Sequence, residues 1–468
     1  MTCQQTQVAT RPQSKLAVVG DWFLRHQAVI RRTQWVVVGV YILLVVVPAF
    51  LPLPDYSRHI WNNLTLFSQF LFWGIWWPFV LISMVLLGRV WCGVFCPEGT
   101  LTEMASRHGR GKAIPRWMRW GGWPFVAFLG TTIYGQMISV YQYPKATLLI
   151  LGGSTVGAII VGFLYGRDKR VWCRYLCPVN GVFGLLSKLA PVHYQTDRET
   201  WTANREQWRR IPAVNCPTLL PLRELDSASS CHMCGRCSGN RDAIALKPRL
   251  PGYEAVFSDP QKATLAEFLL ITFGLGGIAV GAFHWSASPW FVELKQQLAV
   301  WLVNHNALWV LNAHMPWWIF TNYPAQNDVF NLLDGGLLLA YIGATGVALG
   351  LLQTLFLSIA NRFLGRWSLQ RLYHLSYALI PLVGCGVFLG LSSLTVSMLR
   401  AEHVPVFWAN PARALLLGGA TLWAMWLLKG LVMRHSATLA QRVSAYVPGL
   451  AAIGFVSFAW YLLFWGWA

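Results

Sequence analysis

Nine long apolar runs limit what this chain can fold into more than any other feature of its sequence. Each run is close to the about 20 residues that a helix needs to cross the hydrocarbon core of a bilayer. Only 12% of the residues are charged, whereas soluble domains carry about 25%. The sequence therefore predicts an all-α polytopic membrane protein with about nine transmembrane helices. We expect them near residues 35–53, 67–88, 117–140, 146–165, 264–284, 333–359, 374–398, 412–433 and 446–467.

The distribution of basic residues predicts the orientation in the membrane. Residues 166–262 hold fifteen Lys and Arg against nine Asp and Glu, whereas the loop 285–330 holds one lysine against two acids. Short loops rich in Lys and Arg stay in the cytoplasm. We therefore expect a multi-pass protein of the bacterial cell inner membrane, with a cytoplasmic N-terminus and a periplasmic C-terminus. This bias accounts for the net charge of +19, so we expect no nucleic-acid partner.

The segments between the runs divide the chain into four parts. Residues 1–34 form a basic N-terminal segment without the short apolar core of a signal peptide, and we expect it in the cytoplasm. Residues 35–190 form duplicated transmembrane hairpins, and each hairpin ends in C-x-x-x-C-P. Residues 191–262 are a cytoplasmic segment, and residues 263–468 form a five-span membrane domain with an outer loop at 285–332. We expect one or two interfacial helices in that loop.

One cysteine motif occurs twice in the duplicated hairpins. The stretches RVWCGVFCP (89–97) and RVWCRYLCP (170–178) share R-V-W-C-x-x-x-C-P. Cysteines four apart share one helix face, and proline disfavours helical backbone at the preceding residue. We expect each pair where a membrane helix ends at the inner surface. There the tryptophans should mark the interface and the arginines should hold the helix end inside; these residues are Trp91, Trp172, Arg89 and Arg170.

Three interpretations of the four motif cysteines, Cys92, Cys96, Cys173 and Cys177, stay open at this point. The two hairpins together offer four thiolates, which suit a second iron–sulfur cluster or another soft metal. Each pair could instead cycle between dithiol and disulfide, or the cysteines could be small buried residues. Because arginine, tryptophan and proline are present in both copies, we favour a shared metal or cluster site.

A second group of cysteines lies in the cytoplasmic segment. The stretch SCHMCGRCSGN places Cys231, Cys234 and Cys237 in C-x-x-C-x-x-C. Arg241 stands where a ferredoxin motif of this type has its fourth cysteine, and Cys216, followed by a proline, can supply the missing ligand. We expect these four cysteines to hold one [4Fe–4S] cluster. Tetrahedral zinc is the alternative, although zinc sites usually combine two C-x-x-C units.

Together these motifs resemble the membrane polyferredoxins. That group includes the membrane electron-transfer subunits of periplasmic nitrate and nitrous oxide reductase systems, proteins of copper delivery to cytochrome oxidase, and the ferredoxin-like component of bacterial ferrous-iron uptake operons. The resemblance covers about residues 60–250 and rests on the double W-C-x-x-x-C-P and the ferredoxin-like segment after it. Family members commonly carry two complete ferredoxin motifs, whereas this chain has cysteines for one.

The resemblance implies an inner-membrane iron–sulfur electron carrier. Its electrons would pass between the quinone pool, or another carrier at the cytoplasmic face, and a periplasmic redox or iron-uptake partner. It leaves open whether the chain is part of an enzyme, such as a quinol dehydrogenase or a metal reductase. The alternative from another class is an iron or copper permease or reductase with a cysteine-based cytoplasmic acceptor site.

Overall fold

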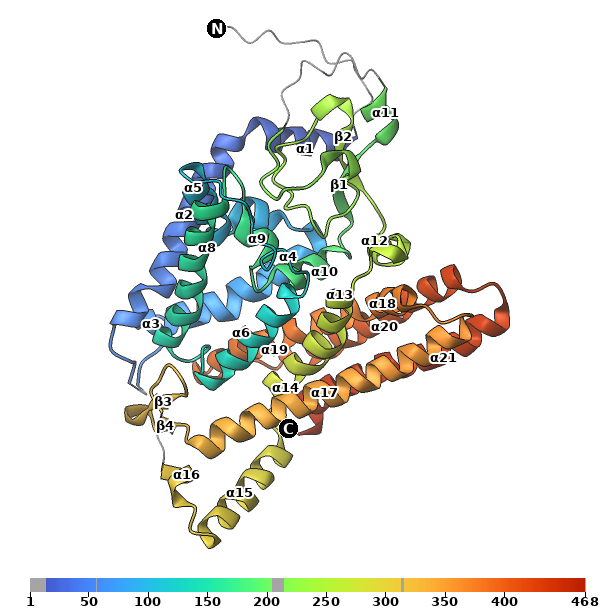
Figure 1. Cartoon of the computed structure of the whole chain (residues 1–468). Coiled ribbons are helices and arrows are strands. Elements are labelled where there is room, and N and C mark those ends of the chain that lie inside the picture. Colours follow the sequence, from blue (N-terminus) through green and yellow to red (C-terminus); the bar gives the residue numbers. More distant parts are fainter. Residues whose placement is uncertain (1–13, 56, 204–213, 313–314, 468) are drawn as a thin grey trace.

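The computed structural model describes residues 14–55, 57–203, 214–312 and 315–467 of the 468-residue chain. The predicted all-α membrane architecture is confirmed: eight helices among the described residues are long and apolar enough to cross a membrane. They run over Gln27–Phe50, Leu64–Leu87, Pro144–Tyr165, Leu265–His284, Leu332–Phe363, Leu369–Ala401, Ala409–His435 and Leu439–Gly466. In Figure 1 the helices of the C-terminal part are strongly inclined to those of the N-terminal hairpins.

The N-terminal part contains the two hairpins and the short helices that follow them. Three of its spans contain a π-helical turn or end in a 3-10 turn, so each span consists of two or three shorter elements. The helices are α1 (Lys15–Arg25), α2 (Gln27–Val45), α3 (Leu64–Gln69), α4 (Trp77–Leu87), α5 (Pro97–Arg107), α6 (Trp123–Met137), α7 (Pro144–Thr147), α8 (Gly153–Tyr165), α9 (Val171–Tyr175) and α10 (Asn180–Ser187).

The segment at residues 191–262, named the cytoplasmic segment after its predicted location, is built around a two-stranded antiparallel sheet. Strand β1 (Val192–Thr196) pairs with β2 (Ile244–Pro248), with Val192 opposite Pro248. The short helices α11 (Arg198–Thr202) and α12 (Tyr253–Phe257) flank the sheet. Helix α1 packs on it so closely that a Cβ atom at Gly20 would lie 3.1 Å from Leu246 Cβ. The sheet thus frames the loop that carries the cysteines and joins it to the N-terminal helix.

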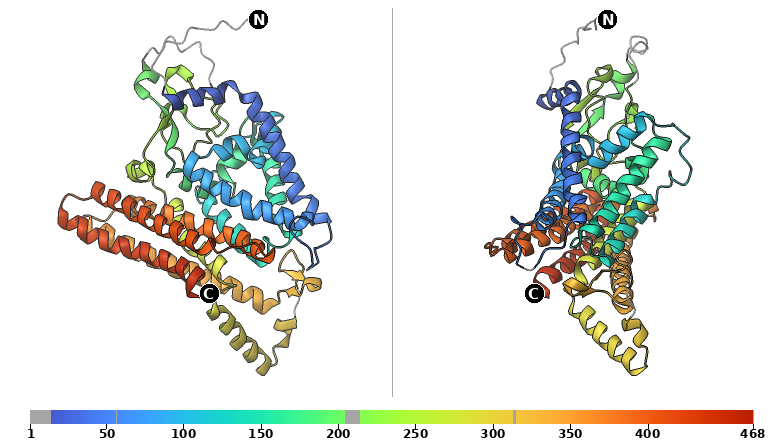
Figure 2. Two further views of the ribbon diagram at one scale, coloured as in Figure 1. Left: turned by 180° about the vertical axis from the view of Figure 1, so that it is seen from behind. Right: turned by 90° about the vertical axis from the view of Figure 1, so that its left-hand side faces the viewer.

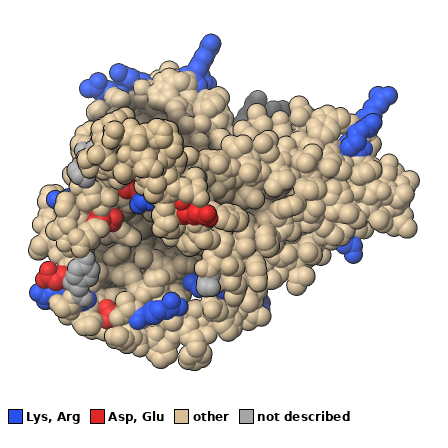
Figure 3. All heavy atoms as spheres, turned by 90° about the horizontal axis from the view of Figure 1, so that it is seen from below, with Lys and Arg blue, Asp and Glu red and all other residues tan. Residues whose placement is uncertain are grey.

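The C-terminal part supplies five of the eight spans. Its elements are α13 (Leu265–Leu269), α14 (Ala279–His284), α15 (Pro289–Asn304), α16 (Leu308–Asn312), β3 (Asn322–Tyr323), β4 (Asp328–Val329), α17 (Leu332–Phe363), α18 (Leu369–Ser376), α19 (Ile380–Ala401), α20 (Ala409–His435) and α21 (Leu439–Tyr461). Helices α15 and α16 form the two predicted loop helices and project away from the body of the protein (Figures 1 and 2). The face seen from below is largely uncharged, with Lys and Arg at few positions (Figure 3).

The span predicted at 117–140 differs most from expectation. Helix α6 there has only fifteen residues, a length of about 22 Å, so it does not meet the length of a full span. It still connects two regions that we predict on opposite sides of the membrane. Pro124 at its start packs against Gly181, just after the second cysteine motif, whereas Met137 at its end accepts a hydrogen bond from Thr321 in the 285–330 loop.

Candidate metal centre

Both copies of the cysteine motif make the same wide backbone turn. The backbone N–H of the second cysteine donates to the tryptophan carbonyl five residues earlier, from Cys96 to Trp91 at 2.9 Å and from Cys177 to Trp172 at 3.0 Å. The extended backbone at Cys96 ends this wide turn, and the following proline begins α5. The expected break in the helix before the proline is therefore present, and it turns both cysteines of a pair toward one space.

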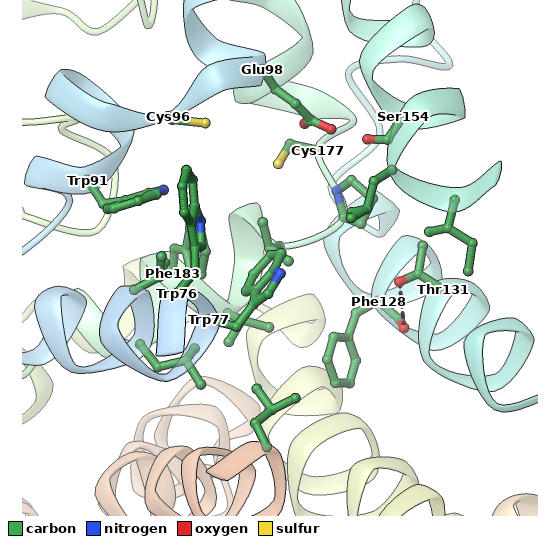
Figure 4. Close-up of a pocket in the computed structure, with 18 of the residues that line it drawn as sticks. Trp76, Trp77, Trp91, Cys96, Glu98, Phe128, Thr131, Ser154, Cys177 and Phe183 are labelled. Carbon is green, nitrogen blue, oxygen red and sulfur yellow. Dashed lines mark hydrogen bonds between the residues drawn. The ribbon is translucent and has the colours of Figure 1, made fainter. Parts of the chain in front are cut away.

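That space is a cavity of about 230 Å³ lined by all four motif cysteines, so the two repeats contribute to one site. Figure 4 shows the sulfur atoms of Cys96 and Cys177 on the same side of it, near the Glu98 carboxylate, with Trp76 and Trp77 opposite. Residues near the middle of three spans also line the cavity; they are Tyr41, Trp76 and Ser154. The cavity thus extends from the cysteines, which follow the ends of their spans, toward the middle of the bundle.

The cytoplasmic cysteines form a second group. The thiol of Cys237 interacts electrostatically with those of Cys231, Cys234 and Cys216, so the loop brings the upstream cysteine to the other three. Lys169 Nζ donates to the Cys216 carbonyl at 3.0 Å, which ties this cysteine to the start of the second repeat. Arg241 instead stacks over Trp201, with 4.4 Å between the guanidinium carbon and the ring centroid.

Burial makes these thiols poor acids on their own. It raises the pKa of the Cys173 and Cys231 thiols to about 12, and it raises the pKa values of Cys96, Cys177 and Cys237 well above the ordinary value. A metal ligand must be a thiolate, and metal binding releases the proton. Iron bound to these five cysteines would supply the positive charge that stabilises their thiolates.

The two cysteine groups touch each other through Gly93. A Cβ atom at this position would lie 2.0 Å from the His232 carbonyl oxygen and 2.9 Å from the Cys234 backbone nitrogen. Only a glycine lets the first motif approach the cytoplasmic loop so closely. The equivalent position in the second repeat is Arg174, so the close contact belongs to the first repeat alone.

Arg89, Arg170 and Trp91 do not have the positions that we predicted from the sequence. Their exposed fractions are 4%, 0% and 8%, so they are not interfacial anchors. The Arg170 Nε atom lies 2.8 Å from a carboxylate oxygen of Glu103, which also pairs with Arg236 at 2.5 Å. Burial alone would raise the pKa of Glu103, but the charges of Arg170 and Arg236 outweigh this effect and lower it.

Several buried donors around the cysteines have no acceptor among the described residues. They are Arg89 Nε, Arg170 Nη2 and His232 Nδ1. Such atoms are costly to bury, and the sulfur atoms of an iron–sulfur cluster accept hydrogen bonds of this kind. The surroundings of the cysteines thus fit a polynuclear cluster of negative charge.

A single metal ion and an iron–sulfur cluster need different arrangements of their ligands. Among the described residues no group of three or more His, Cys, Asp or Glu side chains is arranged to hold one metal ion. A tetrahedral zinc site needs four ligands around one point, whereas the thiolates of a [4Fe–4S] cluster each bind a different iron and lie farther apart.

Comparison with known proteins identifies the cofactor. A family described as a 4Fe-4S binding domain matches residues 69–115 and 148–194, and these segments include all four motif cysteines. The predicted resemblance to membrane ferredoxin-type proteins is confirmed. Two segments of the chain are similar to a 4Fe-4S binding domain, and the cofactor of the chain is an iron–sulfur cluster. Which cysteines ligate the cluster stays our prediction.

Three relatives show how far the similarity extends. The putative electron transport protein YccM of Escherichia coli is 25% identical over 186 residues, which cover 34% of this chain and 50% of that protein. The ferredoxin-type protein NapH of Haemophilus influenzae is 25% identical over 203 residues, or 39% and 67%. The methylamine utilization ferredoxin-type protein MauN of Methylorubrum extorquens is 27% identical over 138 residues, or 27% and 47%. The chain thus spans about half to two thirds of each relative, and no solved structure matches it.

Sequence reasoning missed four residues that shape this site. Glu98 lines the cavity and accepts a hydrogen bond from Trp172 at 3.3 Å, and burial raises its pKa. Glu103 pairs with three arginines, His232 lines the same cavity, and Gly93 joins the two cysteine groups. One signal was available: glycine in the first repeat replaces the arginine of the second.

Proposed function

We propose that this chain is an inner-membrane iron–sulfur electron carrier that exchanges electrons with quinone in the cavity. The same electrons would pass to the cytoplasmic cysteine group and to a redox or iron-uptake partner in the periplasm. The observation that carries the proposal is the cavity itself, because four cysteines of a 4Fe-4S binding domain and an apolar, tryptophan-rich wall meet in it. We assign Cys216, Cys231, Cys234 and Cys237 to one cluster and the four motif cysteines to a second.

The lining of the cavity supports a planar apolar ligand with polar oxygens. Aromatic side chains form much of the wall and include Trp73, Trp76 and Phe183. Within this wall the Trp77 Nε1–H is buried and has no acceptor among the described residues. A quinone carbonyl is an acceptor of the right kind. Ligand sites of this type are mostly apolar with few polar groups that fix orientation.

Quinol oxidation at such a site balances in electrons and protons. A quinol that is oxidised in the cavity loses two electrons and two protons. The iron–sulfur groups accept the electrons one at a time, and the protons leave to water. Cys92 and Cys96 lie beside Gly93, which contacts the backbone at His232 and Cys234, so the electron has a short path to the cytoplasmic group.

The test is reduction of the anaerobically purified protein in lipid nanodiscs by a short-chain benzoquinol or naphthoquinol, followed by EPR. We expect the quinol to transfer electrons to the iron–sulfur cluster and so to change its EPR signal, or the quinone to oxidise the dithionite-reduced protein. In Trp77→Phe the ring stays and the N–H is lost, so we expect about tenfold weaker quinone binding, the value of one hydrogen bond of about 1.4 kcal/mol.

The matched control is Trp120→Phe. Trp120 is 55% exposed and lies outside the cavity lining, so its replacement should leave quinone binding unchanged. Failure of both quinone reactions in a protein whose clusters respond to dithionite would refute the quinone part of the proposal. The iron–sulfur carrier would then require another membrane donor.

A further inference from the structure

The first residue of each cysteine repeat is an arginine, and both arginines are buried between the two cysteine groups. An inference about their role rests on the proposed iron–sulfur function and concerns the reduction potentials of the two groups. A buried charge is costly unless an opposite charge compensates it. The question for each arginine is therefore which anions surround it.

Arg89 contacts segments from both groups. Its Nη1 atom donates to the Ser229 carbonyl at 2.8 Å, two residues before Cys231. Its Nη2 atom donates to the Asn180 side chain at 2.7 Å and lies 3.8 Å from Cys92 Sγ. Among the ion pairs of the described residues, none joins Arg89 to a carboxylate. Its charge acts on Cys173 in the cavity and on Cys231 in the cytoplasmic loop.

Arg170 occupies the equivalent place in the second repeat. Its Nη1 atom donates to the Cys92 carbonyl at 2.6 Å, and its backbone N–H donates to the Pro217 carbonyl at 2.7 Å, next to Cys216. Its charge acts on Cys173 and on Cys234, one cysteine from each group. Glu103 compensates this arginine, so of these two arginines only Arg89 has no carboxylate partner among the described residues.

We propose that Arg89 and Arg170 form a shared positive bridge that raises the reduction potentials of the clusters held by both cysteine groups. Reduction adds negative charge to a cluster, and a nearby cation stabilises the reduced form and so raises its reduction potential. Because each arginine faces both groups, it raises both potentials together. The arginine is present in both repeats because each copy supplies one half of this bridge.

Arg89 is the better residue for a test, since its replacement leaves no carboxylate unpaired. The experiment is an EPR-monitored redox titration of the whole, anaerobically purified protein in nanodiscs, with the iron content of every variant measured. In Arg89→Gln we expect the midpoint potentials of both groups to shift to more negative values. Arg89→Lys keeps the positive charge, and we expect it to restore most of both shifts.

Arg236→Gln is the matched control. Arg236 pairs with Glu103, and its charge acts on Cys234 of the cytoplasmic group. Its removal should shift the potential of the cytoplasmic cluster and leave that of the cavity group unchanged. A role in packing alone would give no such difference between the two arginines and no rescue by lysine.

The outcomes separate this inference from the proposed function. If Arg89→Gln keeps full iron and the cytoplasmic cluster keeps its potential, the bridge is wrong and the electron carrier stands. The cytoplasmic signal decides this even if the motif cysteines hold no cluster, because Arg89 belongs to the membrane repeat. If the purified wild-type protein contains no iron, the proposed function and the bridge fall together.

Discussion

At the scale of single residues, Cys216 decides how the cytoplasmic cluster is completed. Its thiol lies with those of Cys231, Cys234 and Cys237, and its carbonyl is held by Lys169. We predict that Cys216→Ala loses about four iron atoms per chain together with the EPR signal, because a [4Fe–4S] cluster needs all four thiolates. Iron analysis and EPR of the anaerobically purified variant measure both.

Arg241→Ala is the matching control for that prediction. Arg241 follows the C-x-x-C-x-x-C stretch at the place of a fourth ferredoxin cysteine, but it stacks on Trp201 instead. Its replacement should leave the iron content and the EPR signal intact. Full iron and an unchanged signal in Cys216→Ala would show that another group completes the site.

At the scale of elements, the contact between the first repeat and the cytoplasmic loop depends on one glycine. In Gly93→Ala the added methyl group meets backbone atoms of His232 and Cys234, and backbone cannot yield cheaply. We predict destabilisation by about 1–3 kcal/mol, the usual cost of overpacking, and a weaker magnetic interaction between the two reduced clusters. Thermal unfolding in detergent and EPR line shape measure these effects.

The control for this glycine is Gly121→Ala. No atom outside its own neighbourhood lies within 4 Å of a Cβ at Gly121, so we expect no change in stability or EPR line shape. Equal behaviour of the two alanine variants would contradict the proposed tight contact and would require another path between the groups.

The sequence could predict the spans and the cysteine groups, but not the contacts between residues that are distant in the chain. Apolar runs and motif spacing are local signals, and they located eight spans and both groups of cysteines. Arg89 was predicted at the interface because an arginine near a helix end usually lies there. Its actual surroundings come from Ser229 and Asn180, which are distant in the sequence, and no local pattern specifies such a tertiary contact.

At the scale of the whole molecule, the ends of the chain indicate the number of crossings. Helix α1 packs on the cytoplasmic sheet through Gly20, whereas Trp467 contacts Trp290 of the outer loop, with ring centroids 5.6 Å apart. The two ends thus contact segments that we predict on opposite sides of the membrane, an arrangement that would need an odd number of crossings. Eight long helices together with the short α6 satisfy this condition.

The orientation that follows is testable with fusions. We predict that a reporter active only in the cytoplasm is silent when fused after Ala468, and active when fused within the loop that precedes α21. A reporter active only in the periplasm should give the opposite pattern. Cytoplasmic activity at Ala468 would mean that α6 does not cross the membrane.

The repeat itself leads to the last prediction, because one shared site behaves differently from two separate pairs. Both copies make the same backbone turn, and their four cysteines line one cavity. If the four thiolates hold one cluster, the loss of any one of them removes the site. We predict that Cys92→Ala and Cys173→Ala each abolish electron transfer from quinol, and that the double variant is no worse than either single variant.

This non-additivity is the expected sign of residues that act in one unit. The measurement is the rate of quinol-dependent cluster reduction in the four proteins of the cycle, with iron content measured in parallel. Cys385→Ala is the control, since this cysteine lies in α19 and outside the cavity lining, and it should keep the wild-type rate. Two partial losses that multiply in the double variant would instead indicate two independent dithiol pairs, each served by its own repeat.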